Sequence, residues 1–156
     1  MEVSFLADNP HESIKIAQWY FDEWACTVPN VTLDMVHEKV LDRSKSKLEI
    51  PLIVTVHDEQ ELVGAAELKY RENKHYPEYE HWVGGVYVKP THRGKGYSSA
   101  LISKAKEHAN KLGIKSLYLQ CKDHNIGLYV KHGFQALHET EHNSVKRTIM
   151  VYQTGA

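Results

Sequence analysis

Residues 84–101, which read GGVYVKPTHRGKGYSSAL, decide the fold class of this chain. An apolar stretch ends at Pro90, a short basic loop with two glycines follows, and an amphipathic helix is predicted to begin at Tyr97. Glycines allow the backbone to approach an anion closely, and the free N–H groups of a first helical turn point at it. Arg93 and Lys95 add positive charge where a phosphate would lie. The stretch therefore predicts a site for a phosphorylated ligand of the diphosphate type.

Two common phosphate loops do not fit this stretch. A Walker loop is excluded because Lys89 stands where its first glycine would be and Gly96 where its Ser or Thr would be. The dinucleotide fingerprint is excluded because Ser99 replaces its third glycine. The remaining pattern, Val-x-Pro-x-x-Arg-Gly-x-Gly-Tyr-Ser over residues 88–98, resembles the acetyl-CoA loop of the GNAT superfamily of N-acetyltransferases. A basic surface turn without a ligand is the alternative.

The resemblance implies which residues hold acetyl-CoA. Its loop residues would bind the diphosphate: Arg93, Gly94, Lys95, Gly96, Tyr97 and Ser98. Its preceding strand would pair its backbone with the pantetheine arm at Val86, Tyr87 and Val88. Many members also contact the cofactor through an Asn for which this chain has Lys122, and Asn125 is the nearby candidate.

A second motif supports the same family from a later part of the chain. The run Leu-Tyr-Val-Lys-His-Gly-Phe at residues 128–134 resembles the family's Leu-Tyr-x-x-x-Gly-Phe. In that family the tyrosine lies near the sulfur of CoA and protonates the departing thiolate, a role that falls here to Tyr129. The alternative is that Tyr129 is a packing residue on a short helix capped by Gly133.

The pair Gly84-Gly85 lies inside the strand that leads to the loop. Glycines weaken a strand, and they usually mark a bulge or a close backbone approach. In the resembling family this strand bulges and splays from the next, which opens a slot for the pantetheine arm. A packing gap against a helix is the other explanation.

The rest of the chain alternates strands and helices as the GNAT fold does. Strands are predicted at residues 3–6, 52–56, 62–70, 80–88, 116–120, 134–140 and 148–152, and the later helices at 97–112 and 125–132. The first helix is predicted to begin with a capping box at residues 9–12 and to bury Ile14, Ala17, Phe21 and Trp24. The second is predicted to begin at Thr32 and to bury Leu33, Val36, Val40 and Leu41. We therefore expect an α/β fold of the α+β type, with a mixed sheet of six to seven strands flanked by about four helices.

The composition limits the number of domains, the general binding partners and the compartment that we expect for this chain. The 156 residues, 42% of them hydrophobic, are expected to form one domain, 1–156. A net charge of −1 gives no general attraction to nucleic acid or to an anionic membrane. The two cysteines fit a reducing compartment, and neither a signal sequence nor a spanning stretch is recognisable, so we expect a cytoplasmic protein. A homodimer is compatible with this composition.

The chemistry expected is direct attack of a primary amine, on a small molecule or a peptide, on acetyl-CoA. An alkylamine has a pKa near 10, so a base must accept its proton. Glu80 matches a strand position at which some histone-acetylating relatives keep a catalytic glutamate; His81, Glu67 and His75 are alternatives. Glu80 is equally compatible with a solvated charge at a strand end. In the alternative ping-pong route, the thiol of Cys121 would be the nucleophile that first accepts the acyl group.

Other readings stay open beside this one. A regulatory domain that binds acyl-CoA without turnover is the alternative function, although the presence of Tyr129 argues against it. Residues 138–142 match the zinc motif His-Glu-x-x-His, but they begin in a predicted strand, where the two histidines would be roughly 13 Å apart. We therefore expect no metal. The loop 71–80, which carries Glu72, Glu78 and Glu80, would attract a polyamine, an aminoglycoside or a peptide N-terminus; an ordinary solvated loop is the alternative.

Overall fold

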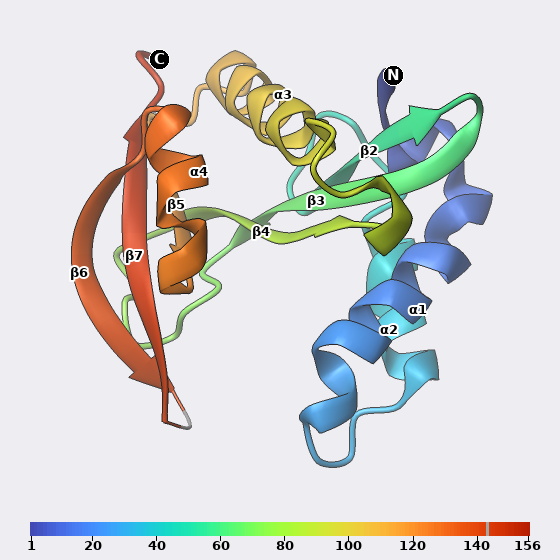
Figure 1. The fold of residues 1–156 in the computed structure, drawn as a ribbon, viewed down its shortest axis with the longest axis horizontal. Coiled ribbons are helices and arrows are strands. Elements are labelled where there is room, and N and C mark those ends of the chain that lie inside the picture. The colour runs from blue at the N-terminus through green and yellow to red at the C-terminus, as the bar shows by residue number, and fades with distance from the viewer. Residues whose placement is uncertain (143) are drawn as a thin grey trace.

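A mixed sheet with helices on both faces forms the fold in the computed structural model, which describes residues 1–142 and 144–156 (Figure 1). Within these residues the seven strands are β1 (Glu2–Phe5), β2 (Leu52–Asp58), β3 (Glu61–Tyr70), β4 (His81–Val88), β5 (Ser116–Cys121), β6 (Gln135–His142) and β7 (Val145–Gln153). The four α-helices are α1 (Ser13–Glu23), α2 (Leu33–Asp42), α3 (Tyr97–Lys111) and α4 (Ile126–Lys131). The predicted fold class is confirmed.

The sheet has the order β1-β2-β3-β4-β5-β7-β6, and β4 and β5 are its parallel pair. Figure 1 shows two halves, β1–β4 and β5–β7, which meet at β4 and β5. Successive residues of β2 explain the two helical layers, because side chains of a strand alternate between faces. Leu52 and Val54 pack in the cluster with α3 and α4, whereas Ile53 packs in the cluster with α1 and α2.

The face that α1 buries differs from the prediction. Ile16, Ala17 and Tyr20 are buried, whereas Ile14 is 64% exposed and Trp24 is 41% exposed. Both stripes have helical spacing, so the sequence pattern alone does not fix the rotation of the helix. Tyr20 faces inward, where its hydroxyl donates a hydrogen bond to the carbonyl of Gly85 on β4.

The predicted capping box at residues 9–12 is wrong. Asn9 makes no side-chain cap, and residues 10–12 form a short 3₁₀ turn before α1. The carboxylate of Glu12 pairs with the buried imidazole of His57 instead, at 2.9 Å. Glu12 therefore pairs with a residue that is distant in sequence instead of capping the helix.

The other helices follow the sequence more closely. The side chain of Thr32 caps α2 by accepting from the backbone N–H of Met35 at 3.2 Å. Val36 and Val40 are buried as predicted, but Leu41 is 41% exposed. The sequence pattern puts Leu101, Ile102, Ala105, Ala109 and Leu112 on the inner face of α3; the first four are buried, whereas Leu112, just after the helix, is only partly buried. Across the part of the chain that is described, no helix combines the length and the apolar character needed to cross a membrane.

Candidate active site

The loop before α3 has the backbone that the glycines predicted. Gly94 and Gly96 have φ values of +76° and +88°, in the left-handed region that favours glycine. A Cβ on either would meet nothing within 4 Å, so conformation rather than space requires these glycines. The loop borders a cavity of about 210 Å³ at the start of the helix, into which Leu128 of α4 also reaches.

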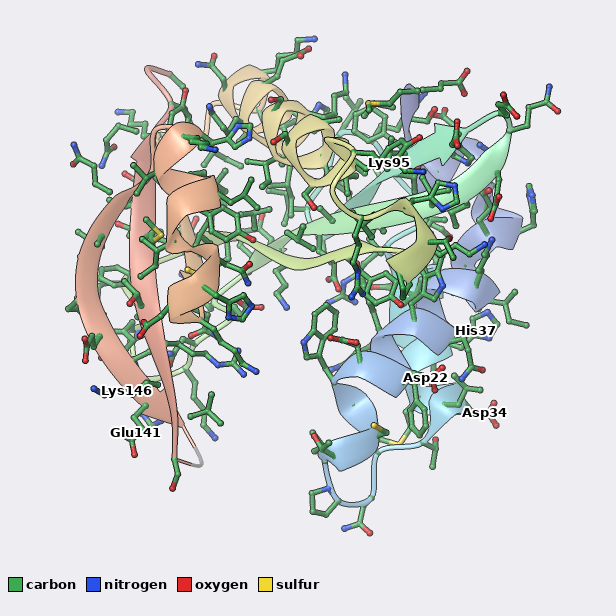
Figure 2. The ribbon with its side chains drawn as sticks, viewed as in Figure 1. Asp22, Asp34, His37, Lys95, Glu141 and Lys146 are labelled. Atoms are coloured by element: carbon green, nitrogen blue, oxygen red, sulfur yellow. The ribbon has the colours of Figure 1, made fainter. Side chains whose placement is uncertain are left out.

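Six of the predicted cofactor residues line this cavity: Val88, Arg93, Gly94, Gly96, Tyr97 and Ser98. The lining within the described residues does not include the other four, which are Val86, Tyr87, Lys95 and Asn125. Figure 2 shows Lys95 on the loop at the start of α3. Asn125 lies in the turn that precedes α4.

Positive charge in the loop is available to a ligand. Among residues 1–142 and 144–156, the salt bridges include neither Arg93 nor Lys95. The Nε of Arg93 donates to the carbonyl of Val88 at 2.8 Å, and its guanidinium lies 5.4 Å from the ring centroid of Tyr87. These contacts orient the guanidinium without neutralising it. The neighbouring Lys89, by contrast, is paired with Glu61.

The predicted bulge in β4 is confirmed. Glu67 of β3 faces Gly84, but Ala65 faces Tyr87, so β4 has one more residue than β3 in this interval. Gly85 has a φ of +55°, and the hydroxyl of Tyr20 donates to its carbonyl at 2.6 Å. The strand also separates from its neighbour, because β4 and β5 are in register only where Trp82 faces Tyr118.

Tyr129 lies on α4, on the same side of the sheet as the loop cavity, in the apolar cluster that includes α3. Its ring is buried and packs edge-on against Phe134, with centroids 5.9 Å apart. Burial, followed by the charges of Cys121 and Glu72, raises the pKa of Tyr129 to about 12. The phenol therefore keeps its proton at neutral pH, as an acid requires.

The candidate bases differ in exposure and partners. Glu80 is half exposed, and its carboxylate lies 3.0 Å from Arg71 and 3.1 Å from His81. Glu67 is buried beside the bulge and forms a 2.7 Å ion pair with Arg43 of α2. His75, the last candidate, is exposed in the loop between β3 and β4.

From the sequence, Glu72 is only one charge of that loop, but the structure gives its carboxylate a defined place. Its Oε1 would lie 2.5 Å from a Cβ on Gly84, so the carboxylate fills the space that the glycine leaves. Lys69 holds it at 2.9 Å, and both side chains are largely buried. Burial lowers the pKa of Lys69, but the charges of Glu72 and Glu67 outweigh it, so that pKa lies above its ordinary value. The signal in the sequence was the glycine itself.

Two alternative chemistries lose support from the geometry. Burial, with a contribution from Asp123, raises the pKa of Cys121 to about 11, so the group is a thiol and a poor nucleophile at neutral pH. Residues 138–142 lie on β6, as predicted, and His138 is 3.1 Å from the hydroxyl of Tyr79. The described residues contain no group of three or more side chains that could hold a metal.

Comparison with known proteins agrees with this geometry. The family described as Acetyltransferase (GNAT) family matches residues 14–134. The structure is similar to yncA from Salmonella typhimurium, solved with its cofactor acetyl-CoA, at 20% identity and a TM-score of 0.76, with 99% of this chain and 94% of that chain covered. It is similar to the ribosomal-protein-alanine N-acetyltransferase from Brucella melitensis at 16% identity and a TM-score of 0.77, with 98% and 99% covered.

A third similar structure is an aminoglycoside 6′-N-acetyltransferase complexed with coenzyme A. It has 13% identity and a TM-score of 0.75, with 99% of this chain and 97% of that chain covered. No curated protein matches the sequence.

Proposed function

Because the chain belongs to the GNAT acetyltransferase family and is an acetyl-CoA-dependent acetyltransferase, we propose that its acceptor is a primary amine on a small molecule or a peptide. The cofactor part of this proposal rests on the loop before α3, which borders a cavity at the helix start and whose Arg93 and Lys95 are in none of the salt bridges of the described residues. A diphosphate fits this chemistry, because free N–H groups and unpaired cations both favour an anion.

We propose that the loop from Arg93 to Ser98 binds the diphosphate of acetyl-CoA. The pantetheine arm then runs back along β4, from Val88 towards Val86, and Asn125 contacts it from the turn before α4. This path leads the thioester to the bulge at Gly85 and to the opening between β4 and β5.

In the proposed reaction, the acceptor ammonium loses a proton to Glu80, and its nitrogen then attacks the thioester carbon. A C–N bond forms, and the C–S bond breaks as the tetrahedral intermediate collapses. The sulfur takes a proton from the hydroxyl of Tyr129, which regains one from solvent, and the amide nitrogen releases its second proton to water. The buried phenol of Tyr129 is protonated at neutral pH, so a proton is available when the thiolate departs.

Two similar structures suggest acceptor classes to test. One is a ribosomal-protein-alanine N-acetyltransferase and another is an aminoglycoside 6′-N-acetyltransferase. The loop 71–80, with the exposed Glu78 and the stacked rings of Tyr76 and Tyr79, provides negative charge and aromatic faces that suit a cationic amine. Residence in the cytoplasm and a homodimer stay predictions.

A thiol-release assay with acetyl-CoA tests the proposal. The acceptors are spermidine, kanamycin and a peptide with a free N-terminal alanine, each at pH 7.5. We expect thiol release that depends on one of these amines, with acetylated amine detected by mass spectrometry in equal amount. Acetyl-CoA binding without thiol release from any of the three would instead favour a regulatory acyl-CoA-binding domain.

A further inference from the structure

Tyr20 connects α1 to the bulge of β4. Its hydroxyl donates to the carbonyl of Gly85 at 2.6 Å, and its side chain is 6% exposed. The contact leaves no room for a side chain on the strand, because a Cβ on Gly85 would lie 2.9 Å from the hydroxyl oxygen. The hydrogen bond therefore depends on glycine at this position.

The surroundings of Tyr20 keep its phenol protonated, so that it can donate a hydrogen bond. Burial raises the pKa of Tyr20 well above its ordinary value, and the charge of Glu67 adds to that effect. Glu67 is itself fixed by Arg43, at 2.7 Å, on α2. Since its pKa is raised, the phenol keeps its proton, so the hydrogen bond runs from Tyr20 to Gly85.

This bond determines where the next N–H points. The Cα register between β3 and β4 pairs neither Gly85 nor Val86, so their shared peptide lies at the bulge. In a trans peptide the carbonyl and the N–H point in opposite directions. Since the carbonyl of Gly85 is directed at α1, the N–H of Val86 is directed to the other side of the sheet, where Tyr129 and the loop cavity lie. Figure 1 shows α3 on that side and α1 on the opposite one.

We propose that Tyr20 is a positioning residue, which aims the N–H of Val86 at the thioester carbonyl oxygen of acetyl-CoA by holding the carbonyl of Gly85. The inference rests on the proposed function, which brings the thioester to the bulge. Negative charge develops on that oxygen when the amine attacks, and an N–H already pointing at it stabilises the charge without reorganisation.

The test compares Tyr20→Phe with Ser13→Ala. Ser13 is the matched control because it is also buried, belongs to the same helix, and donates its hydroxyl to a backbone carbonyl, that of Pro10, at the same 2.6 Å. The first readout needs no acceptor: the ¹³C resonance of [1-¹³C]acetyl-CoA bound to each protein. The second is kcat with whichever amine the wild-type enzyme acetylates, and the third is the Kd of CoA, which has no thioester.

The wild-type protein and Ser13→Ala should shift the carbonyl resonance downfield from its position in water, and Tyr20→Phe should lose most of that shift. The kcat of Tyr20→Phe should fall about 10- to 100-fold, which is less than the loss of an oxyanion donor outright. The Kd of CoA should stay within about 2-fold in all three proteins, since the diphosphate loop is untouched.

An unchanged carbonyl resonance in Tyr20→Phe would overturn the inference, as would an equal kcat loss in Ser13→Ala. A weaker Kd of CoA in Tyr20→Phe alone would also overturn it, because the N–H would then serve the pantetheine arm. Failure of the proposed function is distinct from these outcomes: it is the absence of amine-dependent thiol release from the wild-type enzyme.

Discussion

The loop before α3 and the bulge of β4 lie on one strand-loop-helix segment, but they are held in different ways. In the loop, two left-handed glycines face open space and Arg93 donates to the carbonyl of Val88. At the bulge, Gly85 is pressed by Tyr20, which is 65 residues away in sequence, and the adjacent Glu67 is paired with Arg43. The loop is shaped by local sequence to receive an anion, whereas the bulge is shaped by the rest of the fold.

The largest expected effect tests that difference through two Gly→Ala substitutions. Both glycines have a positive φ, so each alanine costs about 1–2 kcal/mol of strain. Gly85→Ala adds a clash with Tyr20, and overpacking costs about 1–3 kcal/mol more. We expect Gly85→Ala to lower the free energy of unfolding by about 2–5 kcal/mol and Gly94→Ala by about 1–2 kcal/mol, measured by urea denaturation. Equal losses would remove the distinction between the two regions.

The next effect concerns the proton acceptor near the acceptor loop. Glu80→Gln should lower kcat about 10²-fold at neutral pH, with recovery as the pH approaches the pKa of the amine, near 10. Glu141→Gln is the control, since Glu141 is an exposed carboxylate on β6, away from the loop 71–80. Steady-state rates between pH 6 and pH 10 give the profile. A pH–rate profile of Glu80→Gln like that of the wild-type enzyme would mean that His81, Glu67, His75 or water accepts the proton of the amine instead.

Tyr129→Phe tests the acid on the other side of the sheet. The penalty should be about 10²-fold in kcat, at the lower end of general-acid effects, because a thiolate with a pKa near 8.5 leaves tolerably without help. The raised pKa of Tyr129, about 12, predicts that its ionisation causes no fall in the wild-type rate below pH 10. Stability and acetyl-CoA affinity should change little, since the ring remains. A large loss of CoA binding would make Tyr129 a cofactor contact instead.

The smallest expected effect is at the two cysteines. Cys121 is buried with a pKa raised to about 11, whereas Cys26 is exposed. Iodoacetamide at pH 8 should alkylate Cys26 and leave Cys121 unmodified, as read by peptide mass spectrometry. Cys121→Ala should keep kcat within about 3-fold, because direct transfer does not use the thiol. An acetylated Cys121 trapped with acetyl-CoA would argue for the ping-pong route.

The parts that the sequence predicted well are those that local chemistry dictates. The strand, the proline, the glycine loop and the inner face of α3 follow from periodicity and turn residues, and the structure has all of them. The bulge was also foreseeable, because Gly84-Gly85 weakens a strand without a local reason.

The parts that it missed depend on partners far along the chain. Tyr20 is buried with its hydroxyl on Gly85, and the predicted stripe of Ile14, Phe21 and Trp24 has equally helical spacing. Glu12 pairs with His57 rather than capping a helix. The place of Glu72 depends on Lys69 and on the missing side chain of Gly84. Periodicity gives no information on such pairs, since they form only when the sheet has assembled.

Calorimetric titration of acetyl-CoA into wild-type protein, Arg93→Ala and Lys89→Ala tests the central claim, that the loop before α3 holds the diphosphate. Lys89 is the control because it is a neighbouring cation already paired with Glu61. We predict that Arg93→Ala weakens binding by about 1.5–3 kcal/mol, the contribution of a charged hydrogen bond, and that Lys89→Ala changes it by less than about 0.5 kcal/mol. Equal affinity of wild-type protein and Arg93→Ala for acetyl-CoA would contradict the assignment.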